Sequence, residues 1–264
     1  MKNLIEEHSQ RFLPYLTSRQ IDQMQDKDKA VVILPVASIE QHGPHLPVFT
    51  DSIIAQEVLT RALALLPDDV PAWFLPLLPY GKSNEHAGLA GTFTLRSEVF
   101  IQTLKEIGEN VARNGFKRFA IVNAHGGNSE IVDFVIRDIR EATGLLVFGL
   151  HMYLRIAVPQ SGLTEDEMTY GIHAGDVETS MLLSCCPELV HMDLAPDSTP
   201  HQLKKLNTPP FMGPLNFAWL TRDITSTGVL GNARTADPAR GETYLADGAA
   251  ELAQMIQKIV EFEF

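Results

Sequence analysis

The sequence has very little cysteine and no excess of positive charge. Cys185 and Cys186 are its only cysteines, and two adjacent thiols cannot join distant parts of a chain, so a disulfide framework is excluded. We expect both thiols to be reduced and buried. The chain carries 21 Lys and Arg against 33 Asp and Glu, a formal net charge of -12. Because nucleic-acid binding depends on clustered basic residues, we expect no nucleic-acid partner.

Long apolar runs are missing as well. No segment approaches the apolar length that a membrane span requires. The first twelve residues, MKNLIEEHSQRF, carry acidic side chains where a secretory signal would have its apolar core. We therefore expect no membrane partner and a cytoplasmic location.

The chain does contain enough apolar material for a large core. Hydrophobic residues make up 45% of the 264 positions, which predicts one domain over residues 1–264 rather than two small ones. Short apolar runs alternate with amphipathic segments. This alternation is typical of an α/β fold, layered α/β/α, with a mostly parallel central sheet.

The strands and helices can be placed approximately from these patterns. Continuous apolar runs predict strands at 31–36, 119–123 and 145–150. Apolar spacing and capping residues predict helices at 53–66, 97–114, from Asn128 to Gly144, after Asp176, and from 242 to the end. Residues 191–241 are rich in Pro and Gly, and we expect an irregular lid or subunit contact there.

A first candidate site follows the predicted strand 31–36. Glu40 and His42 are two residues apart, so in an extended backbone their side chains face the same side. Asp51 follows nine residues after His42, and this loop is long enough to bring a third ligand back over the strand end. Oxygen and nitrogen ligands together suit zinc, manganese or iron.

Two other junctions offer the same chemistry. His125 follows the predicted strand 119–123 beside two glycines, which let the backbone bend sharply and approach a ligand. His173 and Glu178 surround the start of a later helix. Because loops at the carboxyl ends of parallel strands converge at one edge of a sheet, we expect these junctions to meet there.

Structural alternatives stand beside these interpretations. Asp176 can cap the helix that it precedes, and we assign structural roles to His45 and His151. His86, in the loop sequence SNEHAG, is either a substrate contact or a residue that fixes its loop by a hydrogen bond.

In combination, the motifs resemble those of the creatininase (creatinine amidohydrolase) family. This family also includes formamidopyrimidine-type deformylases and a peptidase of mycofactocin maturation. The resemblance implies a layered α/β fold, a dinuclear metal site and assembly into homohexamers. It rests on SIEQHGPHLP with Asp51 behind it, PYGKSNEHAGLAGTF at 79–93, NAHGGN, HAGDVETS, and TSTGVLGNARTADPARGE at 225–242.

The resemblance also implies a role for each candidate residue. His173 matches a histidine that works as a proton shuttle in the family. Two divalent ions per chain are implied, and we expect zinc, with manganese or iron as alternatives. The implied ligands are Glu40 and His125 for one ion, His42 and Glu178 for the other, and Asp51 as the bridge.

Two departures bear on the substrate. The creatinine-cleaving branch carries an acidic metal ligand two residues after the histidine that matches His125, and this chain has Gly127. The acidic residue before the shuttle histidine is Ile172 here. We therefore expect hydrolysis of a non-peptide C–N bond in a small amide, cyclic amide or formamide other than creatinine, by hydroxide that the two metals make available at neutral pH.

Two other functions are considered. A metal-dependent phosphoesterase would use the same ions, but only Lys82 and Arg234 lie near the motifs to hold a phosphate. A non-catalytic oligomeric relative could keep the metals for stability. The complete ligand set together with His173 favours an enzyme over that second alternative.

Overall fold

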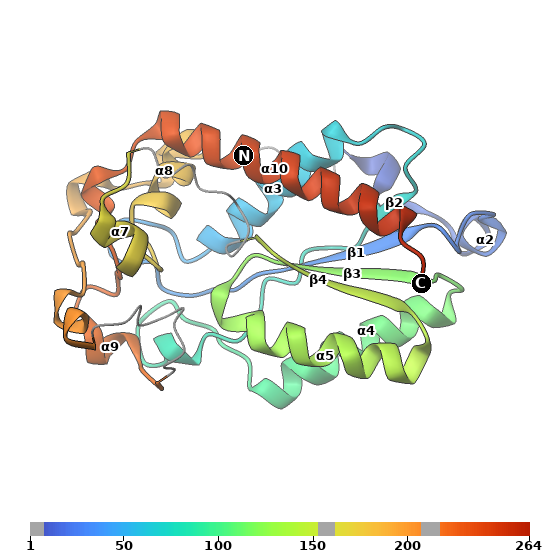
Figure 1. Cartoon of the computed structure of the whole chain (residues 1–264), viewed down its shortest axis with the longest axis horizontal. Coiled ribbons are helices and arrows are strands. Elements are labelled where there is room, and N and C mark those ends of the chain that lie inside the picture. Colours follow the sequence, from blue (N-terminus) through green and yellow to red (C-terminus); the bar gives the residue numbers. More distant parts are fainter. Residues whose placement is uncertain (1–7, 153–161, 207–216) are drawn as a thin grey trace.

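The computed structural model describes residues 8–152, 162–206 and 217–264. Its described part contains a sheet of four parallel strands in the order β2-β1-β3-β4 (Figure 1). The predicted α/β class is confirmed, and the pairing within this sheet is entirely parallel. The strands are β1 (Val31–Val36), β2 (Ala72–Phe74), β3 (Arg118–Asn123) and β4 (Leu146–His151).

The two central strands, β1 and β3, are buried along their whole length. Burial on both faces explains why each is mostly apolar instead of alternating with polar residues. In their pairing, Val31 lies opposite Arg118 and Val36 opposite Asn123. The two strands therefore end level with each other, and the loops that follow them leave from one edge of the sheet.

Helices cover both faces of the sheet (Figure 1). One face packs on a core shared with α3 (Thr50–Leu65), α8 (Asp176–Cys185) and α10 (Pro238–Glu261). The other packs against α4 (Ser97–Arg113) and α5 (Ser129–Thr143). This arrangement confirms the predicted layers.

Glycine permits the close packing of α10 against α8. A Cβ atom at Gly241 would collide with the backbone carbonyl oxygen of Ser180, so the two helices could not approach as closely with a larger residue. Asp237 caps α10 by accepting hydrogen bonds from the backbone N–H groups of Ala239 and Arg240. Gly144 ends α5 in the left-handed conformation, as predicted, with φ of 74°.

Some predicted boundaries are wrong. Helix α10 begins at Pro238 rather than at 242, because Asp237 followed by Pro at the first helical position is itself a start signal. Asn128 does not cap α5 with its side chain. The elements not predicted are short: β2, α2 (Ser18–Gln23), α7 (Glu165–Tyr170) and α9 (Thr221–Ile224).

Both cysteines are free, as expected, but only Cys186 is buried, whereas Cys185 is partly exposed. The predicted absence of a secretory signal concerns the first twelve residues, of which 1–7 lie outside the described part. The described portion of segment 191–241 forms 3₁₀ turns, α9 and the first turn of α10, and residues 207–216 of it are not described. Leu230 forms an isolated bridge with His173, which brings this segment to the carboxyl edge of the sheet. No helix among the described residues is long and apolar enough to span a bilayer.

Candidate metal centre

The residues that the sequence singled out as metal ligands come together at the carboxyl edge of the sheet. Glu40 and His42 lie on the loop after β1, His125 follows β3, and Asp51 and Glu178 lie in the first turns of α3 and α8. All five are buried, between 0% and 8% exposed. The convergence follows from the level ends of β1 and β3 and from two helices that begin beside them.

Asp51 lies between two imidazoles. Its Oδ1 is 3.3 Å from Nε2 of His42, and its Oδ2 is 3.1 Å from Nδ1 of His125. The two oxygens thus face different ring nitrogens. This geometry suits a carboxylate that bridges two cations, one beside each imidazole.

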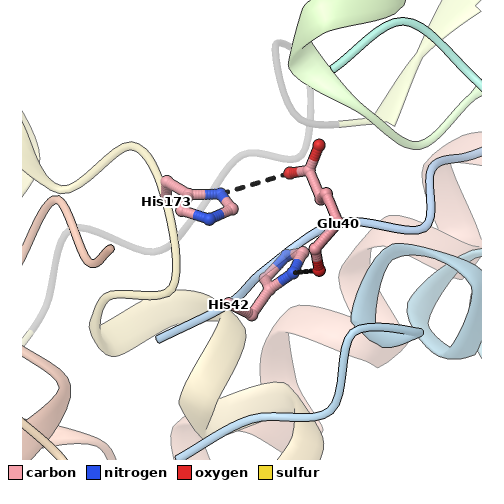
Figure 2. Close-up of side chains that lie close together, drawn as sticks. All are labelled: Glu40, His42 and His173. Atoms are coloured by element: carbon pink, nitrogen blue, oxygen red, sulfur yellow. Dashed lines mark hydrogen bonds and ion pairs between the residues drawn. The ribbon is translucent and has the colours of Figure 1, made fainter. Parts of the chain in front are cut away.

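Glu40 is completely buried, and neither carboxylate oxygen has a hydrogen-bond partner among the described residues. Its Oε2 lies 3.2 Å from Nε2 of His125, and its Oε1 lies 3.4 Å from Nδ1 of His173. Figure 2 shows His173 directed at this carboxylate. A buried carboxylate without hydrogen bonds is costly unless a cation compensates its charge, so this group fits a metal ligand.

His42 is held in the tautomer that a metal ligand needs. Its Nδ1 donates to the backbone carbonyl oxygen of Glu40 at 3.0 Å (Figure 2). A carbonyl oxygen only accepts, so Nδ1 carries a proton, and in the neutral ring that a metal binds the lone pair is on Nε2. That Nε2 is buried, has no hydrogen-bond partner among the described residues, and faces Asp51 and, at 3.9 Å, Oε2 of Glu178.

Glu178 is fixed by a strained turn just before α8. Its Oε2 accepts a hydrogen bond of 2.5 Å from the backbone N–H of Ala174. Ala174 has a positive φ of 52°, the only non-glycine residue with positive φ among those described. Strain of this kind persists only where the surroundings enforce it, and it is concentrated at functional sites.

Without metal, protons on the side chains of the cluster compensate the negative charge of its carboxylates. Burial lowers the pKa of His42, but Asp51, Glu178 and Glu40 outweigh it and raise that pKa to about 9. Burial raises the pKa of Glu178 to about 7. Binding of divalent ions would displace these protons, which is the usual coupling between metal binding and protonation.

The loop after β2 holds His125 in place. Nε2 of His125 lies 2.9 Å from the carbonyl oxygen of Lys82 and 3.3 Å from Oγ of Ser83. The Asn128 side chain connects this loop to β1, because it accepts from the Lys82 N–H and donates to the carbonyl oxygen of Ala37. This explains why Asn128 is not available as a helix cap.

His173 is buried beside two other histidine rings, with centroids 4.4 Å from His42 and 4.2 Å from His86. Burial, together with these neighbouring imidazoles, lowers the pKa of His173 well below its usual value. Its Nε2 lies 2.8 Å from the backbone oxygen of Gln41 and 3.0 Å from the side-chain Nε2 of the same residue. Gln41 therefore offers this ring nitrogen both an acceptor and a donor.

His86 lies beside Glu40 and is only 2% exposed. Its Nδ1 is 2.9 Å from Nε2 of Gln41 and 2.7 Å from Oγ1 of Thr221, while its Nε2 is 3.3 Å from Oε1 of Glu40. These contacts join three segments of the chain. They fit the loop-fixing alternative for His86 and also place it against a proposed metal ligand.

The acidic and histidine residues assigned structural roles have partners elsewhere. Asp176 accepts from Arg240 and Thr235 instead of capping α8, and His45 makes a hydrogen bond with Thr179. His151 contacts Asp133, on α5.

Sequence reasoning missed two residues at the site, Gln41 and Glu85. Gln41 lies between Glu40 and His42, and Glu85 precedes His86 in a motif already singled out. Oε1 of Glu85 is 3.5 Å from Nε2 of His125. The available signal for Glu85 was the glycine at 127, which leaves room for an acidic side chain from another loop.

Several sets of these residues could hold an ion. In each set the possible ligand atoms lie within 4.8 Å of one another. With the unpartnered atoms of Glu40 and His42, this donor set fits divalent metal ions bound by carboxylate and imidazole. The sets are Glu40, His42 and His173; Glu40, Glu85 and His125; and His42, Asp51 and Glu178.

Comparison with known proteins agrees with this chemistry. The creatininase family model, described as creatinine amidohydrolase, matches residues 14–256. A mycofactocin precursor peptide peptidase of Mycolicibacterium smegmatis is 30% identical over 92% of this chain and 89% of its own length. The creatinine amidohydrolase of Pseudomonas putida is 28% identical over 94% of this chain and 96% of its own. The solved structure of a mutant creatininase complexed with creatine has a TM-score of 0.73 at 25% identity, and the match covers 94% of this chain and 98% of the other.

Proposed function

Because the chain belongs to the creatininase family of metal-dependent amidohydrolases, we propose that it uses two divalent ions to hydrolyse the C–N bond of a small amide or formamide. The observation that carries this proposal is Asp51, whose two oxygens face the imidazoles of His42 and His125. We assign one ion to Glu40, Asp51 and His125, and the other to His42, Asp51 and Glu178. Zinc is the proposed metal, with manganese or iron as alternatives, because carboxylate and imidazole ligands suit all three.

Two ions bound there would polarise the amide carbonyl and lower the pKa of a water molecule. The protein's own residues would hold the ligands in place before substrate arrives. His42 is oriented by the Glu40 carbonyl oxygen, and Glu178 by the Ala174 N–H. Pre-oriented ligands of this kind need little rearrangement during the reaction.

We propose His173 as the proton shuttle to the leaving nitrogen. Its Nδ1 faces the Glu40 carboxylate, and its Nε2 meets both the backbone oxygen and the side-chain amide of Gln41. When Nε2 carries the proton it can donate to the oxygen, and when it does not it can accept from the amide. Gln41 thus supports either neutral tautomer, so a proton at Nδ1 can come and go.

We propose that creatinine is a poor substrate. Residue 127 is glycine, and Glu85 Oε1, the Lys82 carbonyl oxygen and the His125 ring leave no space for a side chain there. Ile172, next to His173, is 38% exposed. It places an apolar side chain where the creatinine-cleaving branch of the family has an acidic one. An apolar or formyl-bearing amide fits this environment better than creatinine.

Activity screening tests the proposed function. The metal-loaded protein would be assayed against creatinine, other cyclic amides, formamides and short peptides, with metal content measured on the same preparation. We expect turnover of at least one amide or formamide well above that of creatinine. Creatinine turnover equal to the best substrate would contradict the substrate proposal, and no C–N hydrolysis by a preparation holding two ions would contradict the function itself.

A phosphoesterase receives no support from the two cationic residues near the motifs. Arg234 is exposed and donates its Nε to the carbonyl oxygen of Ala195. Lys82 contributes backbone atoms to the site, through its N–H and its carbonyl oxygen. A site for phosphate transfer would need such cations directed at the phosphate oxygens.

We also propose that residues 1–264 act as one domain, in the cytoplasm, as a homohexamer. The single domain is supported by core clusters on both faces of one sheet, which draw residues from Phe12 to Ile259. The hexamer follows the family resemblance, and light scattering on the purified protein tests it by measuring the molar mass.

A further inference from the structure

Glu85 reaches the metal centre from a loop that supplies none of the other acidic ligands. It lies on the 3₁₀ turn Asn84–His86, and its Oε1 is 3.5 Å from Nε2 of His125. Possible ligand atoms of Glu40, Glu85 and His125 all lie within 4.8 Å of one another. The side chain of Glu85 is 18% exposed, so its carboxylate is largely removed from solvent.

The position of Glu85 depends on a glycine in another loop. A Cβ atom at Gly127 would collide with Oε1 of Glu85 and with the carbonyl oxygen of Lys82, and would lie 2.6 Å from Nε2 of His125. Only glycine leaves the Glu85 carboxylate room beside the imidazole. The loop after β3 and the turn at 84–86 are therefore fitted to each other at this point.

The turn that carries Glu85 is well fixed. The N–H of Lys82 donates to Oδ1 of Asn128, and the N–H of Ser83 donates to Oγ1 of Thr94, both at 2.8 Å. Within the turn, the N–H of His86 donates to the carbonyl oxygen of Ser83. A carboxylate on such a support is held near its working position, as a metal ligand must be.

Charge and the unpartnered atoms of Glu40 point the same way. Both oxygens of Glu40 are buried without a hydrogen-bond partner among the described residues, so the Glu40–His125 position suits a cation. Glu40, Asp51 and Glu178 carry three negative charges between them, whereas two divalent ions carry four positive ones. Glu85 would supply the fourth negative charge while the water on the ions is still neutral, in a buried site where unbalanced charge is costly.

We propose that Glu85 is a direct ligand of the ion at the Glu40–His125 position, and that Gly127 makes room for it. This inference rests on the proposed two-metal function. An alternative role for Glu85 is to orient the His125 ring by accepting a hydrogen bond from Nε2. Glutamine could still accept that hydrogen bond but would lack the negative charge, so Glu85→Gln separates the two roles.

The test measures metal affinity. Wild type, Glu85→Gln, Glu85→Asp and the control Glu130→Gln would be titrated with Zn²⁺ against a competing chelator. Glu130 is exposed, in the first turn of α5 after the His125 loop. Absorption spectra of the Co²⁺-loaded proteins would report the coordination of each ion, and thermal unfolding would confirm that each variant is folded.

For Glu85→Gln we expect the affinity for one of the two ions to fall by roughly 10- to 100-fold or more, since loss of even an outer partner costs that much. The Co²⁺ spectrum should change for that ion alone. Glu85→Asp should fall between Glu85→Gln and wild type, and Glu130→Gln should match wild type.

An unchanged affinity and Co²⁺ spectrum in Glu85→Gln, with two ions in wild type, would overturn the ligand assignment and leave the proposed function standing. A wild-type protein that binds no divalent ion would overturn both. If Glu85→Gln fails to fold, Glu85→Asp decides by its own affinity: a value within about twofold of wild type, together with an unchanged Co²⁺ spectrum, counts against direct ligation.

Discussion

Hydrogen bonds to the backbone decide what the histidines at this site can do. The Glu40 carbonyl oxygen accepts a hydrogen bond from His42 Nδ1, which keeps its proton and leaves Nε2 as the nitrogen that can bind a cation. His173 differs, because its Nε2 meets both an acceptor and a donor of Gln41. A ring held in one tautomer suits a ligand, whereas a ring supported in both suits proton transfer. Residue type alone does not separate these roles.

Replacing His173 by alanine tests its assignment as the shuttle. We expect turnover to fall on the order of 100-fold or more, the scale of general acid–base catalysis, because the leaving nitrogen would receive no proton from the protein. Metal content should stay at the wild-type value. Turnover and metal would be measured on the same preparation, with His201→Ala as the control, since the side chain of His201 is 63% exposed.

The His173→Ala result separates three roles. Loss of bound metal together with activity would show that His173 is a ligand and refute the shuttle assignment. Lower melting temperature with turnover kept in the folded fraction would indicate a purely structural residue.

Sequence could indicate some of these residues and not others. Glu40 and His42 were recognisable because alternate residues after a strand face one side, and the structure places both at the sheet edge. Glu85 was not recognised, because its approach to His125 depends on the path of an irregular loop. The contacts of His86 and Gln41 were not recognised either, because their partners lie on distant segments of the chain. Such contacts leave no periodic pattern.

Among the elements, the segment from α7 to α8 arranges the second half of the site. Glu167, on α7, is buried and accepts hydrogen bonds from the backbone N–H groups of Asp176 and Asn232. A Cβ atom at Gly171 or Gly175 would collide with its carboxylate. One side chain thus joins α7, the start of α8 and the loop that follows Leu230. His173 lies between α7 and α8, and Glu178 lies in the first turn of α8.

Glu167→Ala should therefore lower the free energy of unfolding by about 1–3 kcal/mol, because two backbone N–H groups lose their acceptor in a buried place. Denaturant unfolding measures this, and Glu165→Ala is the matched control, since Glu165 is exposed on the same helix. An equal stability of the two variants would show that Glu167 does not hold these segments together.

Long amphipathic or apolar elements were predictable, and short ones were not. Helices α4 and α5 and strands β1, β3 and β4 were placed to within about one residue at every end, since their apolar patterns extend over several turns or a whole strand. β2 has three residues, and α9 has four. Elements of that length are stabilised by the neighbours that they pack against, so their own sequences carry little signal.

At the scale of the whole molecule, the fold buries an unusual amount of negative charge at one end of its core. Glu40, Asp51 and Glu178 are each less than 10% exposed. Their repulsion is relieved by protons and imidazoles when no cation is present, and bound metal would relieve it more fully. Metal binding should therefore stabilise the native chain.

Removing metal with a chelator should lower the melting temperature. At a free metal concentration about 100 times the Kd, each ion that binds stabilises a protein by about 2.7 kcal/mol. For a chain of this size that corresponds to roughly 5–10 °C. Differential scanning calorimetry with and without chelator measures the shift, and restoring zinc should reverse it. A melting temperature that ignores both treatments would show that the buried carboxylates are not a metal site.

The most direct test of the account is the number of metal ions per chain in wild type and in Asp51→Asn. We expect close to two divalent ions in wild type by elemental analysis. Asp51→Asn should lose most of both, since Asp51 lies between the two imidazoles, while Asp247→Asn, an exposed position on α10, should keep both. A wild-type protein without bound metal, or an Asp51→Asn protein that retains two ions at unchanged affinity, would contradict the proposed centre.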